Sequence, residues 1–363
     1  MKRDLFVYAG QSNMMGASVL PPSRAIECRD SYEYKHKARR LGKDRGEFVM
    51  ASYPVGEFSY IDMKSAYAPG CVDMKGRSLL SDYIKNTYFC PAMSNLLSKD
   101  DLTVSQFSEF SESTAKDGAT LAPFVAEGME KLSRPSAYAH IAKGGVSIDY
   151  YMSDEMRDEY ARRIKAYNAE HNMAYDEGIP DPHPKPGAPK YFIEKCKDFF
   201  ADAESYFGNE LSGNRCLVWL QGEADAYRSD VEYEIMLDVL WEHIKPLGFT
   251  HIFIVRVDYF GGDRIERIMR AQENFVKKHS DAYMLTRAAS FLAYPNQDED
   301  SWFDTPPNDD ERLCRDSFLG YNNNHINEKG FMLIAERCVK NIYRVLEEGK
   351  QPILENEKIK ALL

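Results

Sequence analysis

Near its beginning the chain reads Leu5-Phe6-Val7-Tyr8-Ala9-Gly10-Gln11-Ser12-Asn13-Met14-Met15-Gly16, a short apolar run that leads into a serine between two glycines. The run from Leu5 to Ala9 has the length and β-favouring composition of a buried strand. Gly10 and Gly16 allow tight backbone geometry on both sides of Ser12. Ligands of an open α/β sheet bind at the carboxyl ends of its strands, so Ser12 is a candidate nucleophile. The alternative is an ordinary turn in which Ser12 or Asn13 caps a helix.

Further apolar runs have the length of buried strands, and they are Ala137 to Ala142, Cys216 to Leu220, Ile252 to Val257 and Tyr283 to Thr286. The stretches between them are long enough for helical crossovers. Helices are predicted at Phe124 to Leu132, Asp263 to His279 and about Glu328 to Glu348. This alternation predicts an α/β fold, a three-layer α/β/α sandwich around a mostly parallel five-stranded sheet.

We expect one α/β domain over residues 1–348, followed by a C-terminal tail at 349–363. Two long insertions interrupt the predicted strands. The first, at about 21–115, mixes aromatic and charged residues without a clear period. The second, at about 150–207, begins with a charged helical pattern and carries five prolines between Pro180 and Pro189, which favour an extended surface loop.

The composition is that of a soluble globular protein, with 44% hydrophobic and 28% charged residues in a chain of 363. A net charge of −11 argues against nucleic acid as a partner, because phosphates require a basic surface. No apolar run approaches the roughly 18 residues that span a bilayer, so we expect no membrane contact. The seven cysteines are scattered and form no C-x-x-C pair, which favours a reducing cytoplasm and does not indicate a zinc site.

A serine nucleophile requires a base, a group that orients the base, and donors for the oxyanion. His325 is the candidate base, because it lies in the polar stretch Tyr321-Asn322-Asn323-Asn324-His325 directly before the last predicted helix. The other seven histidines lie in charged stretches, in the proline-rich segment or near the ends of elements, except for His140, which is inside a predicted strand and is interpreted as a core residue.

Two other predicted strands end in residues suited to the same chemistry. The first is Leu217-Val218-Trp219-Leu220-Gln221-Gly222-Glu223-Ala224-Asp225, where the Gln221 amide is a candidate oxyanion donor and Glu223 a candidate partner for an imidazole or a sugar hydroxyl. The alternative for Glu223 is a purely structural carboxylate. The second strand ends at Gly144-Gly145, where backbone can approach a ligand closely. Gly118 is a further candidate backbone donor, with an ordinary surface turn as its alternative.

The segments Gly10 to Gly16, Gly144-Gly145 and Trp219 to Asp225, together with His325, occur in the order seen in the SGNH hydrolase superfamily. They most resemble its sialate O-acetylesterase and family 6 carbohydrate esterase branch. The segment Arg270-Ala271-Gln272 before Tyr283-Met284-Leu285-Thr286 is also similar to that branch. The resemblance spans nearly the whole chain except for the two insertions, and it implies a flavodoxin-like fold.

The resemblance implies that Ser12 is the nucleophile and His325 the general base and acid. It also implies an oxyanion hole formed by the Ser12 backbone N–H, a backbone N–H at Gly118 or Gly144, and the Gln221 side chain. Gln11, Gly145 and Asn322 are the remaining residues that we expect near the oxyanion or the substrate. The branch is hydrolytic and needs neither a metal nor another cofactor.

The chain departs from the superfamily at one position. Relatives commonly carry an aspartate three residues before the histidine, where this chain has Asn322. An amide cannot stabilise an imidazolium as a carboxylate does, and such a change in a serine triad costs on the order of 10⁴ in turnover. We therefore expect Glu223 to be the acid, with Asp316 and Asp225 as weaker alternatives.

The predicted function is a serine esterase that removes O-acetyl groups from a carbohydrate through an acyl-enzyme. One alternative is a carbohydrate O-acyltransferase that uses the same residues. The other is a non-catalytic glycan-binding protein, for which Asn322 is the only direct support. The expected partner is an O-acetylated carbohydrate.

Overall fold

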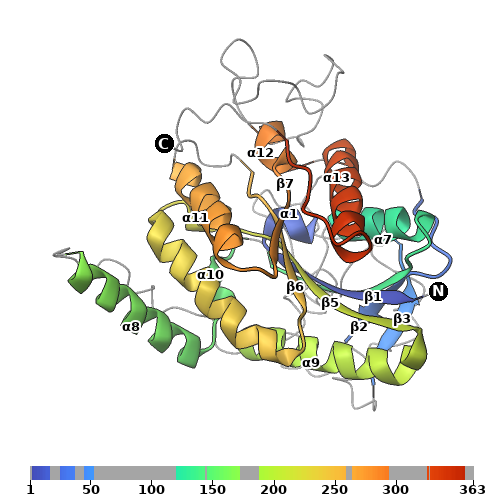
Figure 1. Cartoon of the computed structure of the whole chain (residues 1–363). Helices are drawn as coiled ribbons and strands as arrows, with labels where there is room; N and C mark the ends of the chain where they lie inside the picture. The colour runs from blue at the N-terminus through green and yellow to red at the C-terminus, as the bar shows by residue number, and fades with distance from the viewer. Residues whose placement is uncertain are drawn as a thin grey trace, which may run out of the picture.

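The computed structural model describes residues 2–16, 25–36, 45–52, 120–143, 145–171, 188–258, 264–293, 325–326 and 328–355. Its centre is a seven-stranded sheet in the order β3-β2-β4-β1-β5-β6-β7 (Figure 1). The strands are β1 (Arg3–Gly10), β2 (Tyr32–Lys35), β3 (Glu47–Met50), β4 (Ser136–Ala142), β5 (Leu211–Leu220), β6 (His251–Val255) and β7 (Ala282–Thr286). Neighbouring strands are parallel except for β2 and β3. The predicted α/β fold with a mostly parallel sheet is confirmed.

The five predicted strands correspond to β1, β4, β5, β6 and β7, and the sheet extends beyond them by β2 and β3. Both additional strands lie in the first predicted insertion. Tyr34 of β2 is fully buried, and its hydroxyl donates to Asp202 at 2.6 Å. Glu33 and Lys35 form a buried ion pair of 2.7 Å. Because Asp202 satisfies the Tyr34 hydroxyl, and Glu33 and Lys35 satisfy each other, a segment without an apolar pattern can form a strand.

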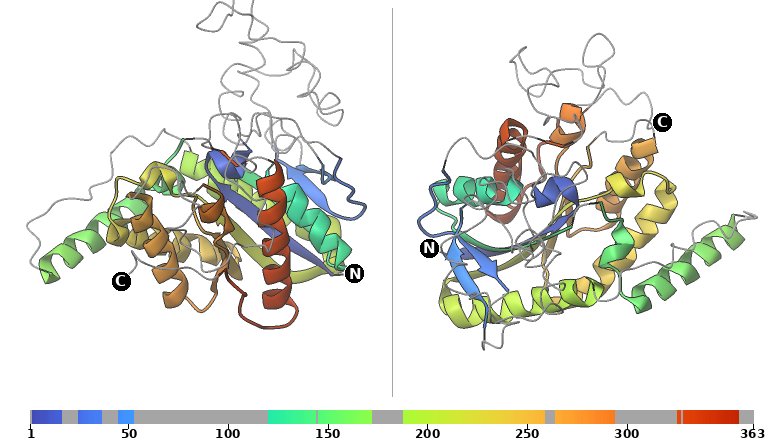
Figure 2. Two further views of the ribbon diagram at one scale, coloured as in Figure 1. Left: turned by 90° about the horizontal axis from the view of Figure 1, so that it is seen from above. Right: turned by 180° about the vertical axis from the view of Figure 1, so that it is seen from behind.

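Helices cover both faces of the sheet (Figures 1 and 2). One face packs against α1 (Ser12–Met15), α7 (Leu121–Lys131), α12 (Ala288–Ala293) and α13 (Glu328–Leu346). The other packs against α8 (Asp154–Glu170), α9 (Ala188–Phe207), α10 (Asp230–Ile244) and α11 (Ile265–Lys278). Short 3-10 helices are η1 (Ile148–Tyr151), η2 (Gly208–Glu210), η3 (Glu223–Asp225) and η4 (Lys245–Leu247). Helices α8 and α9 belong to the second predicted insertion, and they form part of the layer that covers the sheet.

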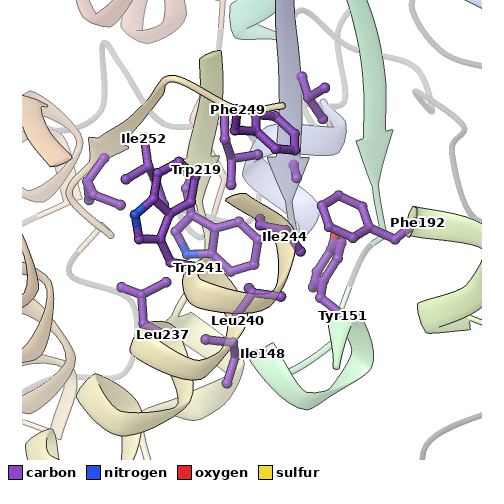
Figure 3. Close-up of a cluster of buried hydrophobic side chains, with 14 of the residues drawn as sticks. Ile148, Tyr151, Phe192, Trp219, Leu237, Leu240, Trp241, Ile244, Phe249 and Ile252 are labelled. Carbon is purple, nitrogen blue, oxygen red and sulfur yellow. The ribbon is translucent and has the colours of Figure 1, made fainter. Parts of the chain in front are cut away.

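The central strand β1 is buried along its whole length, as expected for a parallel strand covered on both faces. Its side chains alternate between two apolar cores. Phe6 and Tyr8 face α7 and α13, whereas Val7 packs in the core beneath α10. Figure 3 shows part of the second core, where Trp219 and Trp241 lie among aliphatic side chains. Close packing on both faces of β1 therefore holds the carboxyl end of this strand in a fixed position.

The strand ends define where a ligand site is expected. The register pairs Gly10 with Ala142 of β4 and with Leu220 of β5, so these three strands end at the same level. The chain crosses from β4 on one side of β1 to β5 on the other. That crossing is a topological switch point, the place where open α/β sheets bind ligands at their carboxyl ends.

Within the described residues, no helix combines the length and apolar composition that a membrane crossing requires.

Candidate active site

Ser12 follows β1 after Gln11 and begins α1, a single helical turn at the carboxyl edge of the sheet (Figure 1). The N-cap of this turn is Gln11, whose side chain makes no capping hydrogen bond, so neither Ser12 nor Asn13 is the cap. The Ser12 side chain is partly exposed. Its hydroxyl has no hydrogen-bond partner among the described residues, which leaves it available for chemistry.

Buried groups fix the turn that carries Ser12. The Met14 carbonyl accepts hydrogen bonds from the Thr120 hydroxyl at 2.6 Å and from His140 Nε2 at 2.8 Å. A carbonyl oxygen only accepts, so Nε2 carries the proton of this imidazole. Complete burial lowers the pKa of His140 to about 3, and the ring is therefore neutral. His140 is thus a buried residue of the core, as its position in the predicted strand indicated, and its Nε2 is hydrogen-bonded.

The side chain of Asn13 forms hydrogen bonds to three separate segments of the site. Its Nδ2 donates to Glu223 Oε1 at 3.0 Å and to Asp258 Oδ2 at 2.7 Å, and its Oδ1 accepts from the Ile326 backbone N–H at 3.0 Å. Ile326 is 313 residues away in the sequence and directly follows His325. One side chain beside Ser12 thus joins the segment of the predicted base to the carboxyls that follow β5 and β6.

The carboxyl of Glu223 is buried, and only one of its oxygens is used. Oε1 accepts from Asn13, while Oε2 has no hydrogen-bond partner among the described residues. Burial raises the pKa of Glu223 from its ordinary 4.5 to about 7, against the opposing effect of the Asn13 hydrogen bond. A carboxyl held near its midpoint at neutral pH is typical of functional sites.

The His325 imidazole is half-buried, and burial lowers its pKa below the ordinary 6.5. It is thus mainly neutral at pH 7, the form that a general base requires. Within the described segments, His325 makes no direct hydrogen bond to Ser12 or to Glu223. The three predicted catalytic residues are joined indirectly, since Ser12 and His325 each precede a residue of the Asn13–Ile326 hydrogen bond. Catalytic hydrogen bonds often shorten only when substrate binds.

Gln221 is fully buried and lies within a network of its own. Its Nε2 faces Asp225 Oδ2 at 2.5 Å, the Val146 carbonyl at 3.2 Å and Gln11 Oε1 at 3.3 Å. Gln272 Nε2 donates to the Gln221 carbonyl at 2.9 Å, and its Oε1 accepts from the Val257 N–H at 3.0 Å. The Arg270-Ala271-Gln272 segment thereby connects the ends of β5 and β6.

Asp225, an alternative for the catalytic acid, has other partners. It accepts from Arg228 Nε at 2.7 Å and from the Ile148 N–H at 2.9 Å, in addition to Gln221. Burial raises its pKa from 3.8 to about 6, although Arg228 and Gln221 oppose the rise. These contacts connect the segment after β4 to the segment after β5.

The remaining predicted residues divide into two groups. Gly145 follows β4 in a left-handed conformation with φ of 70°, near the Val146 carbonyl that Gln221 binds. Gly118, Gly144, Asn322 and Asp316 lie outside the described residues. Sequence reasoning missed Asn13 as a link and Asp258 as a site carboxyl. Asp258 directly follows the predicted strand that ends at Val257, and this position at a strand end was the available signal.

Replacement of Gly10 by alanine is expected to lower the free energy of unfolding by about 3 kcal/mol. A Cβ at this position would lie 1.9 Å from the Leu220 carbonyl oxygen and 2.9 Å from Met14 Cβ, and β1 and β5 would have to separate. Gly213→Ala is the matched control, because it also has a positive φ but open space around it, and we expect a loss of about 1 kcal/mol. Urea denaturation measures both, and equal losses would contradict the prediction.

Replacement of Asn13 by alanine is expected to lower turnover about 10²-fold and the free energy of unfolding by about 2 kcal/mol, because two buried carboxyls and the Ile326 N–H lose their partner. Asn341 is the matched control, since this buried amide likewise forms three hydrogen bonds, to Leu285 and Ile353. Asn341→Ala should reduce stability similarly and leave turnover unchanged. Similar turnover in the two variants, measured below their melting temperatures, would exclude a positioning role for Asn13.

No protein-family model matches this chain, and no curated protein matches it in sequence. Among solved structures, it is similar to a protein from Arabidopsis thaliana, with 14% identity, a TM-score of 0.47 and coverage of 94% of this chain and 97% of the other. A carbohydrate acetylesterase from Xanthomonas citri is 12% identical, with a TM-score of 0.43 over 96% of this chain and 57% of that chain. NanS is 12% identical, with a TM-score of 0.44 over 96% and 98%. Values this low leave the function to be argued from the residues of this chain.

Proposed function

We propose that this chain is a serine esterase that removes O-acetyl groups from a carbohydrate. The observation that carries the proposal is the hydrogen bonding of Asn13, which joins the turn of Ser12 to the segment of His325 and to the carboxyl of Glu223. A hydroxyl without a partner, a neutral imidazole and a buried carboxyl are the groups that acyl transfer requires. The segments at Ser12, Gly144-Gly145, Gln221 to Glu223 and His325 occur in the order seen in the carbohydrate esterase branch that the sequence resembles, and this order supports a carbohydrate as the substrate.

In the proposed reaction, Ser12 Oγ attacks the acetyl carbonyl carbon while His325 takes the hydroxyl proton. The tetrahedral intermediate then collapses, the bond from carbon to the sugar oxygen breaks, and His325 returns the proton to that oxygen. Water, deprotonated by His325, attacks the acetyl-enzyme, and acetate leaves as Ser12 regains its proton. We assign stabilisation of the imidazolium to Glu223, whose Oε2 has no other partner among the described residues.

Acetate release from acetylated sialic acids, acetylated xylan and acetylated bacterial surface glycans tests the proposal. We expect release from at least one of these substrates, with one acetate per free hydroxyl formed. An added sugar acceptor distinguishes an acyltransferase, because transfer would form a new ester in place of acetate. Binding of glycans without any release of acetate would favour the non-catalytic alternative and would contradict the proposal.

A further inference from the structure

The orientation of the Gln11 side-chain amide is determined by its neighbours. Gln11 Oε1 lies 3.1 Å from the Ala224 backbone nitrogen and 3.3 Å from Gln221 Nε2. A backbone N–H only donates, so the oxygen of the Gln11 amide must face Ala224. The NH₂ group therefore faces away from Ala224, and among the described residues it has no acceptor, although Gln11 is only 4% exposed.

The Gln221 amide is in the opposite situation. An amide nitrogen carries two hydrogens, and Gln221 Nε2 has three protein acceptors within 3.3 Å, of which Asp225 Oδ2 is the nearest at 2.5 Å. Its Oε1 accepts from the Tyr233 hydroxyl at 2.8 Å, and the residue is fully buried. No N–H of this side chain is left for a substrate without breaking an existing hydrogen bond.

We propose that Gln11, rather than Gln221, is the side chain that donates to the developing oxyanion, and that Gln221 positions Gln11 and the segment after β4. This inference rests on the proposed esterase function. Gln11 directly precedes Ser12, so its amide and the Ser12 backbone N–H belong to the same turn. Gln221 Nε2 lies 3.3 Å from the Gln11 oxygen and 3.2 Å from the Val146 carbonyl, so the Gln221 amide packs between the two segments.

The energetics favour this assignment. Gln11 Nε2 is not among the fully buried atoms that lack a partner, so its hydrogens are accessible to a ligand bound beside Ser12. A donor that is already oriented in a site of low dielectric needs no reorganisation when the charge develops, which is the most effective form of oxyanion stabilisation. The Gln221 amide would first have to leave the Asp225 carboxylate.

The test uses Gln11→Glu, because a carboxylate keeps an acceptor for the Ala224 N–H and for Gln221 but replaces the NH₂ donor by an oxygen. We expect kcat for acetate release to fall about 10²- to 10³-fold at pH 8, with KM changed less than about threefold. Gln11→Met is the uncharged second variant, for which the same loss is expected. Gln221→Met should lower the melting temperature and reduce kcat by only about tenfold.

A purely structural role for Gln11 predicts that Gln11→Glu retains kcat within about threefold of wild type, and this result would overturn the inference. A loss of kcat in Gln221→Met that equals or exceeds the loss in both Gln11 variants, measured where all are folded, would overturn it as well. Ser12→Ala in the same assay distinguishes a failure of the proposed esterase function from a failure of the oxyanion assignment. If Ser12→Ala retains activity, the proposed esterase function itself fails; if only the Gln11 variants retain it, the oxyanion assignment fails alone.

Discussion

Replacement of Ser12 by alanine is expected to lower the turnover of an acetylated sugar by about 10⁴-fold or more, because the attacking oxygen is removed. The stability of the fold should hardly change. The Ser12 side chain is partly exposed, and its hydroxyl makes no hydrogen bond within the described residues. Acetate release and thermal unfolding, measured on the same preparation, test both parts of the prediction.

The double variant Ser12→Ala/His325→Ala makes this test sharper. Residues that act as one catalytic unit are not additive, so the double variant should be about as slow as either single variant. Multiplied losses would mean that Ser12 and His325 act independently. Ser153→Ala is the control for a serine substitution as such, because this N-cap of α8 accepts from the Met156 N–H at 3.3 Å and lies on another element. It should lose about 1 kcal/mol of stability and no activity.

The parts of the fold that the sequence predicts well are those whose side chains are buried by apolar neighbours alone. Each of the strands β1, β4, β5, β6 and β7 contains an apolar run, because both faces of the sheet are covered. The β2 and β3 strands carry no such run. Polar contacts such as that between Tyr34 and Asp202, distant in the sequence, stabilise them, and no local pattern reports such contacts.

In the candidate site, too, the features that depend on local sequence could be predicted and those that depend on tertiary contacts could not. A strand end followed by glycine and a polar residue predicts the place of Ser12, Gln221 and Glu223, since it depends on local sequence. The partners of each amide depend on tertiary packing and could not be predicted. Gln221 has the residue type of an oxyanion donor, yet its hydrogens face Asp225 and Val146. Asn13 has the residue type of a helix cap, yet it connects β5, β6 and the last helix segment.

Replacement of Glu223 by glutamine is expected to lower kcat by about 10³- to 10⁴-fold, the loss that a neutral acid causes in a serine triad. The pH dependence should change with it. In the wild type, kcat/KM should rise with pH through about 7, where Glu223 ionises, and through the lower pKa of His325. In Glu223→Gln only the His325 step should remain, so the residual activity should reach its plateau at lower pH.

The free energy of unfolding is a second test of Glu223→Gln, and it should increase at pH 8 while kcat decreases. The folded protein holds the Glu223 proton more tightly than the unfolded chain, since burial raises the pKa from 4.5 to about 7. The contribution of this group to stability is therefore complete below pH 4.5 and is lost as the pH rises through about 7, by on the order of 3 kcal/mol. Glu223→Gln should lack this loss and be the more stable protein at pH 8. The pKa of Asp225 is raised in the same direction, so a smaller slope should persist in the variant.

The combination of lower activity with higher stability at pH 8 separates a catalytic carboxyl from a structural one. A structural carboxyl, once replaced, would leave kcat close to the wild-type value whatever the change in unfolding. Glu155→Gln is the control, because Glu155 is an exposed carboxylate on α8, and turnover should not change there. If Glu223→Gln keeps the wild-type step near pH 7 in kcat/KM, another group titrates there, and Asp258, which shares the Asn13 amide, becomes the acid to replace next.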